Sequence, residues 1–540
     1  MRHLIATAAC VACLLAGGSA AAQTIYPVDR AEILVGSRFD LKVEFPGLAK
    51  PADIALTLNG EDHAKVLGRA ADFIEREDGE EQSSLMLRDV SLPNPGTYKV
   101  RATDGTHTRE VTWTVYATGA RRARNVILFI GDGLSPAHRI AARLLSKGIA
   151  EGKAFGKLAM DDMPQMALVA TAGLDTIIAD SANSASAYAT GHKTSNAAMG
   201  VYADRTLNPF DDPRVETITS LVKRRLGLAV GIVTDTEIQD ASPAAMVAHT
   251  RRRREYDRIT EHFFAARPDV IMGGGLANFL PQSTPGSKRK DEQDFVAKFR
   301  EAGYAYATTA AELAAAKSSN KLLGLFNLGN MDGVLDRIFL KGGTVAKFPD
   351  QPDLTAQLGS ALDILSRNPA GFFLMVEAGL IDTYTHAHDM ERAVYDTIML
   401  DNTVRLARDW ARARGDDTLI LVIADHNHSI SLIGTVDEPT AAQPNQPLRE
   451  RVRLYERAGF PNYPPPDANG YPARIDVSRR LALLSASAPN SSVHSGEDVI
   501  LTAAGPGSER VRGQIDNTEV FRVMVEALGL GDGGALNEKR

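Results

Sequence analysis

The sequence predicts an α/β protein: a doubly wound, mostly parallel sheet with helices on both faces, preceded by a small all-β domain of the immunoglobulin-like sandwich type. Two observations carry this prediction. From Asn125 onward, continuous apolar runs such as NVILFIG, LAVGIVT and TLILVIAD alternate with helical stretches. Strands of that kind belong to a sheet that is covered on both faces. Before that point the chain has only short, partly alternating β-rich runs, separated by turn-forming residues.

The first 22 residues have the form of a secretory signal peptide. They begin with a basic residue, continue with an apolar segment from Leu4 to Leu15 and end on small residues, so that we expect a cut after Ala22. The alternative, an uncleaved anchor, is disfavoured because the apolar segment is too short to cross a bilayer. Both cysteines lie inside this segment, so the mature chain would contain no disulfide. We therefore expect a periplasmic or secreted protein stabilised by packing and bound metal.

The bulk composition excludes some partners. With 540 residues, the chain has room for two domains. Its formal net charge of −7 argues against nucleic acid as a partner, because nucleic-acid-binding proteins present broad basic surfaces. An acidic protein can still bind phosphate where divalent ions dominate the local field. We expect no membrane span in the mature chain.

Residues 24–118 are expected to form the immunoglobulin-like sandwich. Its strands are predicted from the runs AEILVGSRFDLKVEF, DIALTLNG, SSLMLRDVSL, GTYKVRATDG and TREVTWTVY. A packing or spacer role is favoured over the binding of a partner or of cell-envelope polymer, since this region contains no cluster of catalytic residue types. A basic linker at 119–124, the main domain at 125–532 and a tail at 533–540 follow.

Two stretches of the main domain interrupt the alternation of strands and helices. Residues 276–350 mix helical and polar segments, and residues 434–488 are rich in Pro, Asn and Arg. Both are interpreted as insertions that lie over or beside the site.

Carboxylates and imidazoles follow several apolar runs of the main domain. In doubly wound sheets the site lies beyond the carboxyl ends of the strands, so these side chains are expected to meet. Any one of these short motifs could be an ordinary loop, but together they predict a site with several metal ions. The candidate ligands are Asp132, Glu377, Asp382, His386, Asp425, His426 and His494.

Ser181 is the candidate nucleophile. It opens the alanine-rich segment DSANSASAYATGHKT, which predicts a helix. A serine hydroxyl needs a base or a metal for activation, and no GxSxG elbow surrounds this residue, so activation by metal is favoured. A helix start also directs free backbone N–H groups at an anion, although a serine there can be a simple N-cap. A metal-activated serine is typical of phosphate-ester hydrolysis.

Several long motifs occur in one order along the chain. They are DSANSASAYATGHKT, EIQDASPAAMVAHT, PDVIMGGG, VEAGLID, ADHNH, HSGED and DNTEVFRVMVEALGL. On these motifs, residues 124–531 resemble the alkaline phosphatases, and the N-terminal region lies outside the resemblance. The resemblance implies that family's fold and the hydrolysis of a broad range of phosphate monoesters through a phosphoseryl intermediate on Ser181. It also allows a homodimer.

The resemblance further implies two Zn2+ ions and one Mg2+ ion. One zinc ion would be held by Asp382, His386 and His494, and the other by Asp132, Asp425 and His426. The magnesium ion would be held by Asp132, Glu377 and Ser242. We also expect two residues just outside the ligand set: Asp240, which would orient a water at the magnesium ion, and His428.

Arg253 falls where the family places its phosphate-binding arginine, four residues after His249. A planar guanidinium can bind two phosphoryl oxygens at once. The other three arginines of the run Arg251–Arg254 are interpreted as a solvated face of a helix.

Two other functions remain as alternatives. The first is a phosphodiesterase of the same superfamily, which Arg253 disfavours because an arginine on two non-bridging oxygens leaves less room for a second ester group. A sulfatase is disfavoured because its nucleophile motif is missing. The second is a non-catalytic binding protein that acts through the immunoglobulin-like module.

Overall fold

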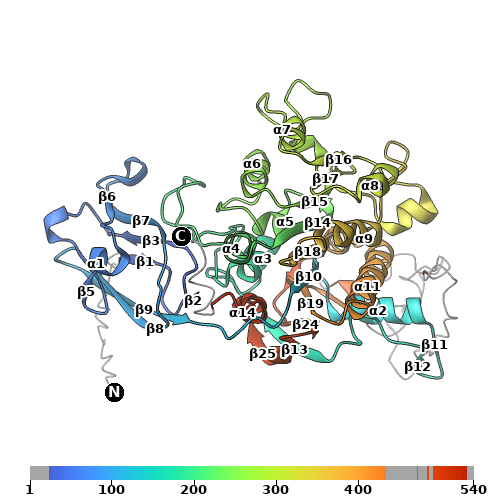
Figure 1. Cartoon of the computed structure of the whole chain (residues 1–540), viewed down its shortest axis with the longest axis horizontal. Coiled ribbons are helices and arrows are strands. Elements are labelled where there is room, and N and C mark those ends of the chain that lie inside the picture. The colour runs from blue at the N-terminus through green and yellow to red at the C-terminus, as the bar shows by residue number, and fades with distance from the viewer. Residues whose placement is uncertain (1–22, 433–470, 472–482, 486–490, 532–540) are drawn as a thin grey trace, which may run out of the picture. The chain divides into compact units, whose positions relative to one another are not determined.

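The computed structural model describes residues 23–432, Tyr471, Leu483–Ser485 and residues 491–531 (Figure 1). The predicted signal peptide, the tail and most of the stretch 434–488 lie outside the described residues.

Backbone packing divides the chain into two compact units. Among the described residues, the first holds Leu41–Leu87 and Thr97–Trp113 together with the segment from Gln23 to Arg30. The second holds Ala31–Asp40, Arg88–Gly96 and the described residues from Thr114 onward. The domain limits given by the sequence stay predictions.

Residues 24–116 form two sheets, and short helical turns lie between some of their strands. A four-stranded sheet has the order β1-β3-β7-β6, and a five-stranded sheet has the order β2-β9-β8-β4-β5. Trp113 is fully buried, and its indole N–H donates to the Pro27 carbonyl at 2.9 Å. The strands are β1 (Thr24–Tyr26), β2 (Glu32–Leu34), β3 (Phe39–Glu44), β4 (Ala55–Leu58), β5 (Glu61–Asp62), β6 (Asp72–Ile74), β7 (Ser84–Val90), β8 (Gly96–Thr103) and β9 (Thr108–Tyr116). The helical turns are η1 (Pro51–Asp53), α1 (His63–Leu67) and η2 (Glu77–Gly79).

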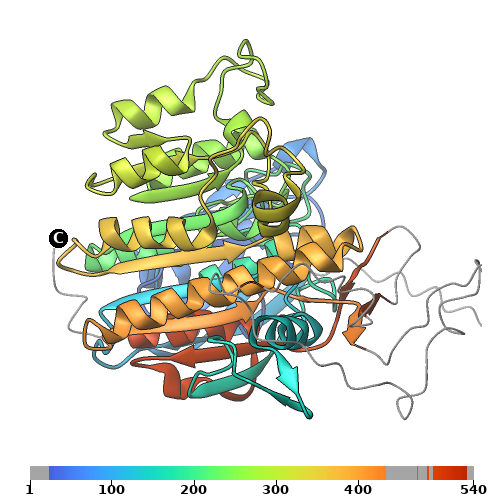
Figure 2. The same cartoon turned by 90° about the vertical axis from the view of Figure 1, so that its right-hand side faces the viewer.

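A ten-stranded sheet forms the centre of the second unit (Figure 2). Its strands, in spatial order, are β16 (Ala305–Ala307), β17 (Leu322–Leu325), β15 (Val270–Gly274), β14 (Ala229–Glu237), β18 (Phe372–Ala378), β10 (Asn125–Gly131), β19 (Thr418–Ala424), β24 (Val499–Ala504), β13 (Gln165–Ala170) and β25 (Arg512–Asp516). Neighbouring strands are parallel, except that β24 runs antiparallel to both β19 and β13. Every residue of β10, β18 and β19 is buried, because helices cover both faces.

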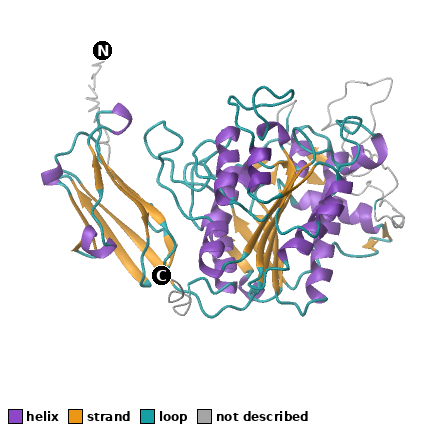
Figure 3. Cartoon of the chain, turned by 45° about the horizontal axis from the view of Figure 1, so that its top comes forward, coloured by secondary structure: helices purple, strands orange, loops and turns teal. Residues whose placement is uncertain are grey.

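Helices lie on both sides of these strands (Figure 3). One layer contains α2 (Pro136–Lys147), α9 (Leu354–Leu365) and α11 (Met390–Arg412). The other contains α3 (Ser181–Thr190), α4 (Ile218–Leu226), α5 (Ala241–Ala245) and α14 (Asn517–Ala527). The predicted fold class, a doubly wound α/β domain preceded by β-structure, is confirmed.

Smaller elements complete the second unit. The helices are α6 (Tyr256–Ala266), α7 (Phe295–Glu301), α8 (Ala310–Ala316) and α10 (Leu380–His386), with turns η3 (Leu276–Asn278), η4 (Asp336–Leu340) and η6 (Ser508–Arg510). Three two-stranded ribbons pair β11 (Ile149–Ala150) with β12 (Lys153–Ala154), β20 (Asn427–His428) with β23 (His494–Ser495), and β21 (Ile430–Leu432) with β22 (Leu483–Ser485).

The stretch 276–350 continues the α/β alternation that it was expected to interrupt. It contributes α7, β16, α8 and β17, and the two strands extend the parallel sheet beyond β15. The polar residues between these short elements concealed the pattern in the sequence. Within the described residues, no helix is both long and apolar enough to cross a membrane.

Candidate metal and nucleophile site

Three neighbouring strands carry the candidate carboxylates to one edge of the sheet. β10 lies between β18 and β19. Glu377 is the last residue but one of strand β18 and lies opposite Ile130 of β10. Asp132 and Asp425 directly follow β10 and β19. All three carboxylates are buried. Their meeting follows from parallel pairing, because the carboxyl ends of parallel strands share one edge.

Ser181 is the first residue of helix α3 and is itself buried. The preceding residue, Asp180, caps the helix: its carboxylate accepts the backbone N–H of Asn183 at 2.9 Å, and the Asn183 side chain accepts the Asp180 N–H at 3.0 Å. The Ser181 hydroxyl oxygen lies 3.3 Å from Nε2 of His426. The capping arrangement fixes the start of the helix and therefore the position of the hydroxyl.

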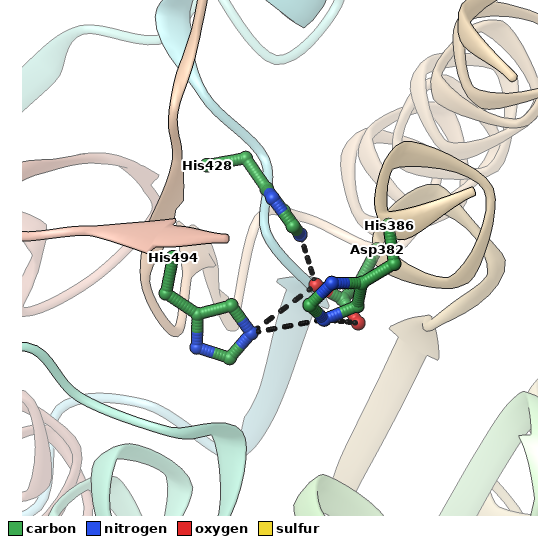
Figure 4. A group of neighbouring side chains, drawn as sticks. All are labelled: Asp382, His386, His428 and His494. Atoms are coloured by element: carbon green, nitrogen blue, oxygen red, sulfur yellow. Dashed lines mark hydrogen bonds and ion pairs between the residues drawn. The ribbon is translucent and has the colours of Figure 1, made fainter. Parts of the chain in front are cut away.

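Asp382 and three histidines form one cluster, drawn in Figure 4. Asp382 and His386 lie one turn apart on α10, with 3.4 Å between a carboxylate oxygen and Nε2. His428 and His494 face each other across the β20–β23 ribbon. His494 Nε2 lies 3.2 Å from His386 Nε2 and 3.6 Å from Asp382. The ligand atoms of these residues lie within 4.8 Å of one another.

Backbone carbonyls orient two of these imidazoles. Nδ1 of His386 donates to the Ser492 carbonyl at 2.8 Å, and Nδ1 of His494 donates to the Ala179 carbonyl at 2.9 Å. In a neutral ring bonded in this way the proton is on Nδ1, which leaves Nε2 as the atom that can bind a metal. His428 differs, because its Nε2 contacts Asp382 and its Nδ1 lies 3.1 Å from the Ser492 hydroxyl.

His426 joins the nucleophile to the carboxylates. Its Nε2 lies 3.4 Å from both Asp132 and Asp425, in addition to its contact with Ser181. Asp132, Asp382 and His426 form a second group whose ligand atoms lie within 4.8 Å of one another. Asp382 therefore belongs to both groups, a shared role that its place in the sequence did not suggest.

Two threonines that the sequence interpretation missed hold Glu377. The hydroxyls of Thr234 and Thr236, both on β14, donate to the same oxygen of Glu377, at 2.5 and 3.2 Å. Alternate threonines at the end of a strand, in VTDTE, are the signal that could have identified them. Ser242 lies in the short helix α5, and Asp240 is the N-cap of that helix.

The buried carboxylates lack compensating positive charge. Burial raises the pKa of Glu377 to about 8 and that of Asp425 to about 7, and burial together with Asp425 raises the pKa of Asp132 well above its usual range. Burial would also raise the pKa of Asp382, but the hydrogen bond with His428 and the neighbouring imidazoles hold it below its usual range.

Some buried oxygens of the expected ligand set make no hydrogen bond of normal geometry with a described residue. Oδ1 of Asp132, Oδ2 of Asp425 and Oγ of Ser242 have no hydrogen-bond partner of normal geometry among the described residues. Buried acceptors without a donor are costly unless a cation binds them. Imidazole and carboxylate ligands suit zinc, and an all-oxygen set with a hydroxyl suits magnesium. The residues present therefore fit divalent metal ions.

Arg253 lines the same cavity as His386 and His494. Its guanidinium lies 2.8 Å from Asp240 and 3.5 Å from Asp180, so that two carboxylates hold it. Ser181 and Arg253 both line a cavity of about 670 Å³, together with Asp382, His386 and His494. The candidate nucleophile, the candidate phosphate-binding arginine and three candidate metal ligands thus share one cavity.

The expectation that the other three arginines form a solvated helix face is wrong in two respects, because the run is not helical and Arg251 is largely buried, whereas Arg252 and Arg254 are exposed as expected. Residues 251–255 form a turn that precedes α6, and all four arginines line the cavity. Only 13% of the Arg251 side chain is exposed, and it pairs with Asp204 and Asp212. The sequence alone favoured a solvated run because the acidic partners of Arg251 lie about 40 residues earlier, in a loop with no regular pattern.

Comparison with known proteins agrees with the geometry. A family model described as alkaline phosphatase matches residues 123–530. An alkaline phosphatase of Escherichia fergusonii is 32% identical over 451 residues, which are 76% of this chain and 86% of that protein. A streptomycin-6-phosphate phosphatase of Streptomyces griseus is 31% identical, over 76% of this chain and 92% of that protein. A solved structure, the alkaline phosphatase of Thermus thermophilus, is 26% identical with a TM-score of 0.60, over 77% of this chain and 93% of that chain.

Proposed function

Because this chain belongs to the alkaline phosphatase family and hydrolyses phosphate monoesters, we propose that it does so through a phosphoseryl intermediate on Ser181. The observation that carries the proposal is the position of this hydroxyl. It lies at the start of α3, 3.3 Å from His426, a candidate metal ligand, in the cavity that Arg253 lines.

We propose the metal complement that the residues fit, two zinc ions and one magnesium ion. Asp382, His386 and His494 would hold the first zinc ion, Asp132, Asp425 and His426 the second, and Asp132, Glu377 and Ser242 the magnesium ion. When bound, these ions would supply the positive charge that lowers the pKa of a hydroxyl or a water and stabilises both ends of an in-line displacement. Their charge would also compensate the buried carboxylates.

The protein side chains would bind and orient the phosphoryl group. The Arg253 guanidinium can donate two parallel N–H groups to two phosphoryl oxygens, because Asp180 and Asp240 already fix its orientation. The start of α3, where Ser181 lies, would add backbone N–H groups that can donate to an anion. This binding leaves the organic part of the ester outside the phosphoryl pocket.

The reaction would then take two steps at phosphorus. In the first, Ser181 Oγ forms a bond to phosphorus while the ester P–O bond breaks, and the alcohol leaves with the electron pair and gains the proton that the Ser181 hydroxyl loses. In the second, a water oxygen forms a bond to phosphorus while the Oγ–P bond breaks, and Ser181 Oγ keeps the electron pair and gains a proton from that water. Each step inverts the configuration at phosphorus, and the products are an alcohol and inorganic phosphate.

Three further proposals concern the export of the chain, the role of its N-terminal region and its assembly. We propose that the chain is exported and cut after Ala22, that residues 24–118 are an accessory immunoglobulin-like module, and that a homodimer forms. The leader pattern supports export, and the β-structure supports the accessory module. The homodimer rests on the resemblance to the alkaline phosphatases alone.

The test is hydrolysis of 4-nitrophenyl phosphate at alkaline pH by three samples: metal-replete protein, EDTA-treated protein and the Ser181→Ala variant. We expect activity that collapses on chelation, returns with Zn2+ and Mg2+ together, and is largely lost in the variant. Trapping of phosphate on Ser181 by acid quench and mass spectrometry would identify the intermediate.

The diester bis(4-nitrophenyl) phosphate distinguishes the phosphodiesterase alternative. Faster turnover of the diester than of the monoester would overturn the proposal. If the metal-replete protein hydrolysed neither the monoester nor the diester, the non-catalytic alternative would remain.

A further inference from the structure

The four consecutive arginines that line the cavity, Arg251–Arg254, divide into two pairs. Arg251 and Arg253 are neutralised by the protein itself. The first has Nη2 at 3.0 Å from Asp212, and the second has Nη2 at 2.8 Å from Asp240. Neither guanidinium is available for the organic part of a substrate.

Backbone hydrogen bonds fix the turn in which the four arginines lie. The N–H of Arg253 donates to the Ala197 carbonyl at 2.9 Å, and the N–H of Glu255 donates to the Arg252 carbonyl at 3.2 Å. With this turn fixed, Arg251 and Arg253 are partly buried, while Arg252 and Arg254 are exposed. Both exposed residues still line the cavity that contains Ser181.

The exposed pair leaves positive charge at the mouth of the cavity. Arg254 has no hydrogen bond or ion pair with any residue in the described part of the chain. Arg252 is partly compensated, because its Nη1 lies 4.0 Å from Glu255 and its Nη2 donates to the Leu207 carbonyl at 3.3 Å. The uncompensated charge therefore lies mostly on Arg254.

We propose that Arg254, assisted by Arg252, binds a second anionic group on the organic part of the substrate. Phosphate monoesters that carry a further phosphate or carboxylate would then be the preferred substrate class. The proposal rests on the proposed function, since it extends the same cavity. Arg253 would take the reacting phosphoryl group, and the exposed guanidinium would gain a partner only when a doubly anionic substrate binds.

The experiment compares substrates that differ by one anionic group. Fructose 1,6-bisphosphate is paired with fructose 6-phosphate, and 4-carboxyphenyl phosphate is paired with its carboxamide. 4-Nitrophenyl phosphate is the reference with no second anion. The ratio of kcat/KM within each pair measures recognition of the second group and cancels effects on the shared chemistry.

Arg254→Ala is expected to lower the ratio for at least one pair by about threefold to tenfold, as expected for a partly exposed charge-assisted contact. Arg254→Lys should keep part of the ratio, and Arg252→Ala should lower it less. Arg258→Ala is the matched control, because this exposed arginine pairs with Glu261 and does not line the cavity. Added salt should lower the wild-type ratio by screening.

A second readout is equilibrium binding to the metal-loaded Ser181→Ala protein, in which Arg254→Ala should weaken the bisphosphate more than the monophosphate. The proposal would be overturned if Arg254→Ala, while still active on 4-nitrophenyl phosphate, lost the same factor for both members of each pair or lost nothing for either member. A metal-replete wild-type protein that hydrolyses none of the substrates would overturn the proposed function, and this inference with it.

Discussion

Single residues away from the metal ligands hold the site in place. Asp235 is buried in β14, and one of its oxygens accepts the backbone N–H groups of Gly379 and Leu380, at 2.7 and 3.1 Å. These two groups lie at the start of α10, the helix that carries Asp382 and His386. One carboxylate on a strand therefore fixes how that helix presents two candidate metal ligands.

Asp235→Ala should weaken metal binding and activity together, because two buried N–H groups lose their acceptor and α10 loses its anchor. We expect about a tenfold loss of zinc affinity and of kcat/KM, comparable to the loss of an outer hydrogen-bond partner of a metal site. Asp235→Asn keeps an acceptor oxygen and should lose less. Zinc competition with a chromogenic chelator measures the first quantity; equal affinities in all three proteins would contradict the assigned role.

A buried histidine outside the site should make stability depend on pH. His192 is buried, and its Nδ1 lies 2.7 Å from the Tyr202 hydroxyl. Burial lowers the pKa of His192 to about 4, below the value of about 6.5 for an unfolded chain. The folded state therefore favours the neutral ring. Its contribution to stability is complete above pH about 6.5 and is lost as the pH falls toward 4, by at most about 3 kcal/mol.

The difference in unfolding free energy between wild type and His192→Gln should therefore shrink as the pH is lowered from 7.5 to 4.5. Urea unfolding at several pH values measures it. A constant difference between wild type and His192→Gln would contradict the prediction.

At the scale of elements, both ends of helix α3 are fixed by specific contacts. Its N-cap Asp180 also accepts the Ala197 N–H at 3.0 Å and pairs with Arg253. Its C-cap, Gly191, has a left-handed φ of 74°, and an added Cβ would lie 2.7 Å from the Phe521 ring. Helix α3, which carries the candidate nucleophile, thus contacts Arg253 at one end and α14 at the other.

Asp180→Asn and Asp180→Ala should separate capping from charge. Asn still caps the helix, so stability should change little, whereas Ala should cost about 1 kcal/mol. Both variants remove the charge that orients Arg253 and should lower kcat/KM for 4-nitrophenyl phosphate. Thermal unfolding and steady-state kinetics give the two quantities. Full activity in the Asn variant would contradict the orienting role.

Gly191→Ala should destabilise the protein more than Gly227→Ala. Both glycines end a helix at positive φ, but the Cβ at Gly227 would meet nothing within 4 Å. Gly227→Ala therefore carries the backbone strain alone, about 1 kcal/mol, and Gly191→Ala adds about 1–3 kcal/mol for the overlap with Phe521. Urea unfolding of both variants measures the difference; equal losses would show that the ring moves aside freely.

At the scale of the whole molecule, buried carboxylates lie together at one edge of the ten-stranded sheet, and bound cations would compensate their negative charge. Strands β18, β10 and β19 each deliver a carboxylate into an interior where burial raises its pKa. Metal ions that bind only the folded state should therefore stabilise the entire second unit.

Chelation should lower the melting temperature of the protein by on the order of 10 °C, and Zn2+ with Mg2+ should restore it. The Ser181→Ala protein should show the same shift although it is inactive, which separates folding from catalysis. Differential scanning calorimetry is the measurement. Elemental analysis would confirm that the metal has been removed. A melting temperature that stays unchanged in that metal-free protein would contradict the stabilising role.

The fold class and the candidate ligands could be predicted from the sequence because each depends on a local pattern. Continuous apolar strands indicated the covered sheet, and Asp132, Glu377 and Asp425 lie at the ends of such strands, where parallel pairing brings them together. The start of α3 was visible as a capping residue before an alanine-rich run. The roles of these residues as ligands and nucleophile stay predictions.

Other features depended on contacts between distant segments. The hydrogen bonds from Thr234 and Thr236 to Glu377, the anchoring of α10 by Asp235, and the division of the arginine run into neutralised and free side chains each join parts of the chain far apart in sequence. Such contacts depend on strand register and loop paths, which a local pattern does not encode. The sequence by itself determined which chemical groups the site contains, and the tertiary structure decided which of them are oriented, compensated or left free to bind.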